Sequence, residues 1–262
     1  MKKTRDTLAA AAIGATALFL LACVLPWGRL LASRFLGPYA FELTASFRDL
    51  FAILAATLAL VMAAAVPASF ASILRPRVGR VIRALLELIE SVPAMLVALF
   101  AYAPFALAMA MGSSSAGSRS SILVFCAAAA ITALPETTRC LTIVLFDLYN
   151  RRYSFAFRSY GLSARAILKT LLGSREMLST IRGAAVNALL KTLILDSSFG
   201  FLVQLGFGSY GRPAHTSPGA LIASYRASLV TGDGAERFWI PVALLAALTF
   251  VFIVYADPEE GR

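Results

Sequence analysis

Long runs without a charged residue alternate with short arginine-rich segments along this chain. Four runs are uncharged throughout, namely Leu8–Leu25, Leu50–Leu74, Ser91–Ser118 and Phe238–Ala256. Each approaches or exceeds the roughly 18–20 residues that cross a hydrocarbon core about 30 Å thick. Only a helix satisfies every backbone polar group inside such a run, so the pattern predicts an all-α membrane protein.

Two further runs contain charges but keep a membrane-spanning length. Ser120–Pro135 is expected to continue toward Phe146, and Gly183–Tyr210 contains Lys191 and Asp196. Counting both predicts six transmembrane helices, with both termini on one side of the membrane. Phe238–Ala256 is then the last span, and Leu8–Leu25 is expected to be a retained first span rather than a cleaved signal.

The basic residues fall between the apolar runs and set the orientation. If the N-terminus is cytoplasmic, 17 of the 24 lysines and arginines lie inside and the other 7 lie outside. This excess agrees with the positive-inside rule, so both termini are expected in the cytoplasm. The net charge of +10 comes with no basic stripe interleaved with aromatic residues. We therefore expect no nucleic-acid partner.

The chain lacks the motifs of catalysis and of nucleotide binding. It has no phosphate-binding Gly-x-x-x-x-Gly-Lys-Ser/Thr loop, no Gly-x-Ser-x-Gly elbow and no His-Glu-x-x-His helix. It has a single histidine, His215, and three cysteines without metal-ligand spacing. We expect no catalytic residue, no metal site and no cofactor on this chain. An energy source would have to be another subunit or an ion gradient.

One cytoplasmic segment, 147–182, is too polar to span the membrane yet is clearly patterned. Apolar residues recur at helical spacing on both sides of Gly161, a glycine that predicts a break between two short helices. These residues are Tyr153, Phe157 and Tyr160 before it, and Ala164, Ile167, Leu168 and Leu171 after it. Such helices either lie on the membrane surface or dock onto another subunit. Periodicity alone favours the surface by about two to one.

Polar groups inside the spans need a reason, because a charge at a helix centre costs roughly 2.5–3.5 kcal/mol on insertion scales. Asp196, followed by Ser197 and Ser198, is expected to face protein or a water-filled path. A hydrogen bond between helices is at least as good an explanation as substrate contact. Glu87 and Glu90 precede the third span and are expected to reach the interface or to pair with Arg80 or Arg83, and Pro93 is expected to kink the helix.

The 155–163 segment, Phe-Ala-Phe-Arg-Ser-Tyr-Gly-Leu-Ser, resembles the Glu-Ala-Ala loop of ABC importer permeases. Ala156, Arg158, Gly161 and Ser163 match that motif, whereas Phe155 and Phe157 replace its acidic residue and its second alanine. From Arg48 onward the chain resembles more closely the dipeptide/oligopeptide/nickel class. Further matches in the same order are Arg48-Asp49, Glu87 with Pro93, Leu134-Pro135 with Arg139, Asp196 with the Phe201–Gly208 run, and Asp257-Pro258.

The resemblance implies the type I importer permease fold, a multi-pass protein of a bacterial-type inner membrane. It divides the chain into an N-terminal helix with its outer loop (1–49), a permease core (50–256) and a tail (257–262). The core would contain a coupling loop at 147–182 and an outer loop at 208–237, which would face an extracytoplasmic substrate-binding protein. Asp196, Ser197, Ser198 and Pro93 would lie on the translocation path or in helix packing.

The resemblance also implies partners. One or two cytoplasmic ATPase subunits would carry ATP and Mg²⁺, and a second related permease would complete the path. The coupling loop would contact the ATPase through Tyr153, Phe155, Ala156, Phe157, Arg158, Tyr160, Gly161, Ser163 and Arg165. In that contact the aromatic residues are expected to be apolar anchors and Arg158 and Arg165 polar rim contacts.

The substrate expected from the resemblance is a peptide, with nickel or another small solute as an alternative. Two interpretations from other classes remain open. An ion-coupled secondary transporter would use an ionisable group such as Asp196 at mid-membrane. A membrane scaffold without transport would make the cytoplasmic segment a surface helix only.

Overall fold

The structure is a computed structural model. It describes residues 36–110, 118–203, 217–231 and 234–256, together with the single positions Gly14, Leu18, Phe19, Cys23 and Arg34. This part of the chain is 90% helical and contains no strand, as the sequence predicts. The expected first span Leu8–Leu25 and the tail at 257–262 lie outside the continuously described residues.

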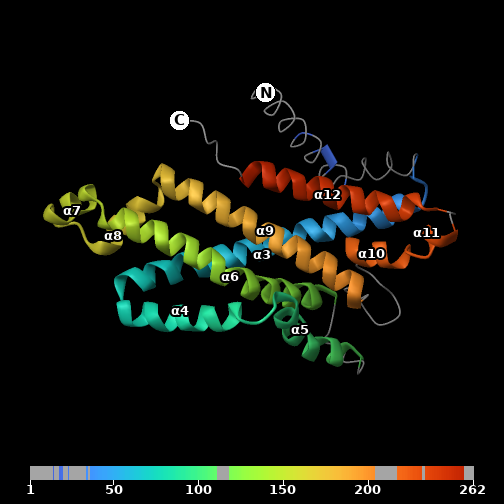
Figure 1. Ribbon diagram of the computed structural model, residues 1–262, viewed down its shortest axis with the longest axis horizontal. Helices are drawn as coiled ribbons and strands as arrows, with labels where there is room; N and C mark the ends of the chain where they lie inside the picture. The colour runs from blue at the N-terminus through green and yellow to red at the C-terminus, as the bar shows by residue number, and fades with distance from the viewer. Residues whose placement is uncertain are drawn as a thin grey trace.

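Four helices are long and apolar enough to cross a membrane. They are α3 (Tyr39–Leu74), α6 (Ser118–Asn150), α9 (Arg175–Val203) and α12 (Glu236–Ala256). Figure 1 shows them running alongside one another through the long axis of the molecule. A fifth span results if the bent pair α4 (Pro76–Glu90) and α5 (Ala94–Ala110) crosses as one unit.

Helix α3 begins at Tyr39, well before the expected start of its span at Leu50. The expected span started at Leu50 because the uncharged run begins there, directly after the charged residues Arg48 and Asp49. In the structure these two side chains pair with each other at 3.2 Å, which reduces the cost of keeping both within a helix. The same segment also contributes buried apolar residues, such as Leu43 and Phe47, to the core.

The described part of the expected third span, Ser91–Ser118, begins with a break and continues as α5. Helix α4 runs back along α3, and the chain then bends by 92° before α5. Pro93 lies at this bend, where its ring removes a backbone donor and prevents a continuous helix. Gly79 allows α4 to approach α3 closely, because a Cβ at this position would lie 2.8 Å from the Ser72 carbonyl oxygen.

The expected pairing of Glu90 with Arg80 or Arg83 is wrong. Glu90 instead forms two hydrogen bonds with the guanidinium of Arg139 on α6, at 3.1 and 3.3 Å. Arg80 and Arg83 lie on the same helix as Glu90, whereas Arg139 comes from a helix that folds against α4. Sequence spacing can find only the intrahelical candidates.

The two ends of the bundle differ. At one end the chain leaves α6 and forms the short helices α7 (Arg152–Ser159) and α8 (Ala164–Leu172) before α9 begins. At the other end lie α10 (Pro218–Ser224) and α11 (Ser228–Thr231), as Figure 1 shows. We call these ends the α7 pole and the α10 pole.

The α10 pole contains helix where turns of an outer loop (208–237) were expected. Helix α10 is buried in the bundle, and its hydroxyl cap Ser217 accepts a hydrogen bond from the Ala220 N–H at 3.3 Å. The pole is held together by two tyrosines that link distant segments. Tyr39 donates to the Arg237 carbonyl at 2.7 Å, and Tyr225 donates to Glu42 at 3.0 Å.

Candidate functional site

The loop that the sequence singles out forms a firmly attached two-helix unit at the α7 pole. Helix α7 begins directly after Arg151 at the end of α6. The fully buried Ser154 hydroxyl donates to the Leu148 carbonyl at 2.8 Å, so the first turn of α7 is bound to the last turn of α6. The same carbonyl, in the last turn of α6, also accepts from the Arg151 N–H at 3.3 Å.

Gly161 separates the two helices, as predicted. Its backbone has φ = +79°, a left-handed conformation that side chains with a Cβ adopt only at a cost. The Leu162 N–H reaches back to the Phe157 carbonyl at 3.2 Å and closes the end of α7. Ser163 then caps α8 by accepting from the Ala166 N–H at 3.3 Å.

The apolar side of α8 faces the protein's own bundle. Ile167, Leu168 and Leu171 are almost completely buried. They pack in one cluster with Leu141, Leu145 and Leu148 of α6 and with residues of α3 and α9. The surface-helix interpretation, which needed this face to contact lipid, therefore does not apply to α8.

Helix α7 divides the predicted contact residues into two groups. Phe157 is half-buried against the same cluster. Arg158 donates to the Tyr149 carbonyl at 2.7 Å and lies over the Tyr149 ring, 4.0 Å from its centroid. Both residues therefore attach α7 to α6, and Arg158 is a structural contact rather than an exposed rim residue.

The other predicted residues point outward. Their large apolar members Tyr153, Phe155 and Tyr160 are 41, 53 and 83% exposed, and Leu162, which was not predicted, is 46% exposed beside them. We call these four the aromatic face. Ala156, Gly161, Ser163 and Arg165 are exposed beside it. The structure thus places most of the predicted set on the outside of one rigid unit.

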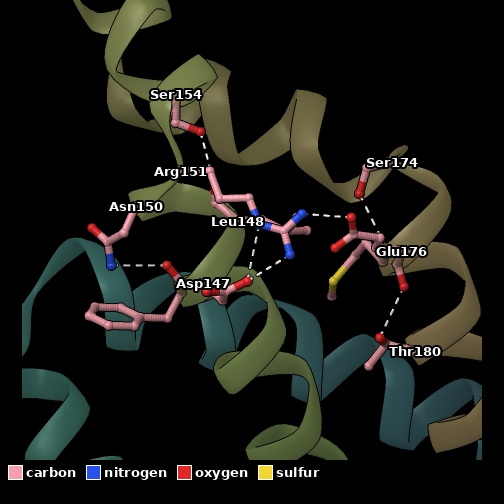
Figure 2. Close-up of polar contacts among 10 residues, drawn as sticks. Asp147, Leu148, Asn150, Arg151, Ser154, Ser174, Glu176 and Thr180 are labelled. Atoms are coloured by element: carbon pink, nitrogen blue, oxygen red, sulfur yellow. Dashed lines mark hydrogen bonds and ion pairs between the residues drawn. The ribbon is translucent and has the colours of Figure 1, made fainter.

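A residue that sequence analysis missed joins the unit to both neighbouring spans. Arg151 donates to Asp147 of α6 at 2.8 Å and to Glu176 of α9 at 2.6 Å, as Figure 2 shows. Hydrogen bonds to Glu176 and then to Asp147 raise the pKa of the Arg151 guanidinium, so it stays charged at any physiological pH. The i,i+4 spacing of Asp147 and Arg151 was a signal in the sequence, but Glu176 was not.

A cavity of about 340 Å³ lies between α4 and α6. Its lining combines apolar residues such as Ile82 and Leu86 with the charged residues Arg83, Glu87 and Arg139. Glu90 also lines it, so the Glu90–Arg139 pair connects its two walls. No pattern in the sequence indicates this cavity, because it forms between segments about fifty positions apart.

The predicted path residues lie in different environments. Pro93 is exposed at the bend between α4 and α5, and Ser197 and Ser198 are half-buried on α9. Asp196 is only 1% exposed, and neither of its carboxylate oxygens has a hydrogen-bond partner among the described residues. The expected hydrogen bond from Asp196 to another helix is therefore not present in this part of the chain.

Among the described residues, no three side chains of the metal-ligating types come together. Cys126 is buried and Cys140 is partly buried, and both are free thiols. The site with the clearest construction is therefore the two-helix unit at the α7 pole. A comparison with known proteins finds no family model that matches this sequence and no curated protein with significant similarity to it.

Proposed function

We propose that this chain is the membrane-spanning permease subunit of an ATP-driven importer, and that the α7–α8 unit docks onto a separate ATPase. The observation that carries the proposal is the aromatic face. Four large apolar side chains project from a unit whose inner side is fixed to the bundle. An exposed apolar patch of this kind on an ordered element is typical of an interaction site.

The composition around the aromatic face favours a protein partner. Arg152, Arg165 and Lys169 are exposed next to it, giving aromatic anchors with a basic rim. Figure 1 places α7 at the extreme end of the molecule along the axis of the spans, where a soluble subunit could approach it. A partner with an apolar groove and acidic margins would fit this surface.

The distribution of charge supports a cytoplasmic α7 pole. Arg75 and Arg77 at the turn between α3 and α4 and Arg175 at the start of α9 add to the basic residues of the loop. The described basic residues near the α10 pole are fewer and include Arg226 and Arg237. Under the positive-inside rule the α7 pole faces the cytoplasm, where ATP is available.

The geometry also supports transmission of movement. Because Arg151 links α6 to α9, a force on α7–α8 would act on both spans together. Movement of α6 would then change the cavity that it shares with α4, with the bend at Pro93 serving as a hinge. Six spans in the type I arrangement would follow if 8–25 forms the first span and α4–α5 the third.

The remaining parts of the proposal follow from the family resemblance. A second related permease would cover the exposed side of α4, which presents Val81, Leu85 and Leu88. An extracytoplasmic binding protein would deliver the substrate, expected to be a peptide, at the α10 pole. Nickel or another small solute is the alternative cargo.

Purification of the tagged chain from the membranes of its natural host tests the proposal. We expect an ATP-hydrolysing subunit to be recovered with the wild-type chain. Phe155→Ala should lower that recovery at least about tenfold, because the ring would be an anchor of the contact. Phe146→Ala is the matched control: Phe146 on α6 is 57% exposed, against 53% for Phe155, but lies outside the aromatic face.

Site-specific crosslinking tests whether the ATPase contacts the aromatic face. A cysteine at Tyr160 is preferable to one at Gly161, because Gly161 has a positive φ that a cysteine would strain. With Cys140→Ser as background, Tyr160→Cys should crosslink to the ATPase. Crosslinks to lipid alone, or recovery of the chain without any ATPase, would contradict the proposal. Uptake into vesicles driven by an ion gradient without ATP would support the secondary-transporter alternative instead.

A further inference from the structure

The bundle contains a buried carboxyl group without a hydrogen-bond donor among the described residues. Asp196 on α9 is 1% exposed, and both of its oxygens are buried without a hydrogen-bond donor among the described residues. Its neighbour Ser197 likewise has a buried hydroxyl group with no such partner among the described residues. Unsatisfied polar atoms therefore lie on two adjacent residues of α9.

Two described cations that could neutralise Asp196, Lys191 and Arg48, form ion pairs with other carboxylates. Lys191, on the same helix, forms an ion pair with Glu136 of α6. Arg48 on α3 pairs with Asp49 at 3.2 Å. The charged group whose field reaches Asp196 is Asp49, and its negative charge opposes a second one.

Among the described residues, the other helices around Asp196 place no cation within its electrostatic reach. Helix α6 contributes Cys126, whose thiol is within electrostatic reach of Asp196 and approaches the Ile53 carbonyl at 3.9 Å. Helix α10 contributes Gly219, and the described part of α10 carries no ionisable side chain. In the described part of the chain, the ionisable groups that face the site are thus Asp49, with its partner Arg48, and Cys126.

A bare carboxylate in such a place is strongly disfavoured, because burial removes its hydration and nothing replaces it. Binding a cation removes the charge, and a proton is the cation that needs only one oxygen and no coordination shell. We propose that Asp196 is a proton-binding site and that its carboxyl group is uncharged when α10 is packed against α9, as in this structure. This inference does not depend on ATP-driven transport.

Helix α10 seals the site. A Cβ on Gly219 would lie 1.9 Å from the Ser197 carbonyl oxygen, and one on Gly200 would lie 1.8 Å from the Ser217 hydroxyl. Only glycine allows this approach, which brings α10 against the turn of α9 that contains Asp196. Proton uptake is therefore linked to the docking of α10, since water that enters between α9 and α10 can stabilise the charged form.

Infrared spectroscopy of the purified chain in lipid bilayers at one fixed pH near neutral tests the proposal. The wild type should show the carbonyl stretch of a protonated carboxyl group, and this band should shift in D₂O. Asp196→Asn should lose the band, whereas Asp147→Asn, a control at an exposed carboxylate of the α7 pole, should keep it. Absence of the band from the wild type, or its persistence in Asp196→Asn, would overturn the proposal.

A parallel measurement separates a proton from a metal cation. If the carboxyl group is protonated, replacing sodium by choline at constant ionic strength should leave the melting temperature of the wild type unchanged within about 2 °C. A larger loss of stability on removing sodium would show that Asp196 holds an alkali cation, and the proton site would be rejected.

The seal is tested by the rate of deuterium exchange at the same band. Gly219→Ala must displace α10 from the Ser197 carbonyl, so the band should exchange at least about tenfold faster than in the wild type. Gly183→Ala is the matched control, because a Cβ at Gly183 meets nothing within 4 Å. Equal exchange rates in Gly219→Ala and the wild type would contradict the role of α10.

Discussion

At the scale of single residues, the residue type predicted the kind of contact that a side chain makes better than it predicted where that side chain points. Arg158 matches a motif residue and was expected at the rim of a partner contact. In the structure its guanidinium lies against the Tyr149 ring and carbonyl and within 4.7 Å of the Phe155 ring centroid, so it fixes α7 in place. Gly161 was predicted correctly, because the need for a positive φ is a local property of the backbone.

Substituting Gly161 should loosen the two-helix unit. Gly161→Ala is expected to cost about 1 kcal/mol, because alanine is disfavoured at φ = +79° while no atom within 4 Å obstructs its Cβ. Gly161→Asn should cost less, since asparagine tolerates this conformation. Hydrogen exchange of the α7 and α8 amides should accelerate about fivefold in the alanine variant.

The control for this experiment is Gly173→Ala. Gly173 closes α8 in the same loop but has φ = −83°, which alanine accepts. If Gly173→Ala and Gly161→Ala accelerated exchange equally, the effect would come from the loss of glycine flexibility in general. The strain at Gly161 would then be excluded as the cause.

At the scale of elements, α8 shows that one amphipathic pattern is compatible with a helix on the membrane surface and with a helix packed against protein. The spacing of its apolar residues predicts one apolar face but does not say what covers that face. The structure places α6, α3 and α9 against it, so α8 is a brace between spans. Within the α7–α8 unit, the large exposed apolar side chains lie on α7 and the turn after it, which restricts the candidate partner contact to this part of the unit.

Removing one side chain from this brace should destabilise the protein. Leu168→Ala is expected to cost roughly 2–4 kcal/mol, because Leu168 is fully buried and its removal leaves a cavity. Thermal unfolding in detergent should report a clearly lower melting temperature. Lys169→Ala on the exposed side of α8 should change it by less than about 2 °C. Similar losses in both variants would mean that α8 is not packed as the structure has it.

At the scale of the whole molecule, the two poles have different constructions. The α7 pole is basic and is joined by the charged contacts of Arg151. The α10 pole is joined by aromatic and tyrosine contacts, including the Tyr39–Tyr225 ring pair at 5.3 Å. Because the two poles differ in charge, the positive-inside rule predicts a single orientation of the molecule in a membrane.

This direction can be measured with single cysteines in a chain whose three native cysteines are replaced. Tyr160→Cys at the α7 pole should react with a membrane-impermeant maleimide only from the cytoplasmic side. Leu229→Cys on α11, where the leucine is 42% exposed, should react only from the opposite side. Labelling of both positions from one side would refute the arrangement of the spans.

The sequence by itself determined the helical class, the approximate position of the spans in the described part of the chain, the break at Gly161 and the concentration of basic residues between the apolar runs. These features follow from bilayer thickness, backbone hydrogen bonding and local conformation, all of which act along the chain. Only the tertiary structure decided that Glu90 meets Arg139, that Arg151 joins α6 to α9 and that Asp196 is buried without a hydrogen-bond partner among the described residues. Each depends on the packing of helices distant in sequence, and no spacing within one segment encodes which side chains that packing brings together.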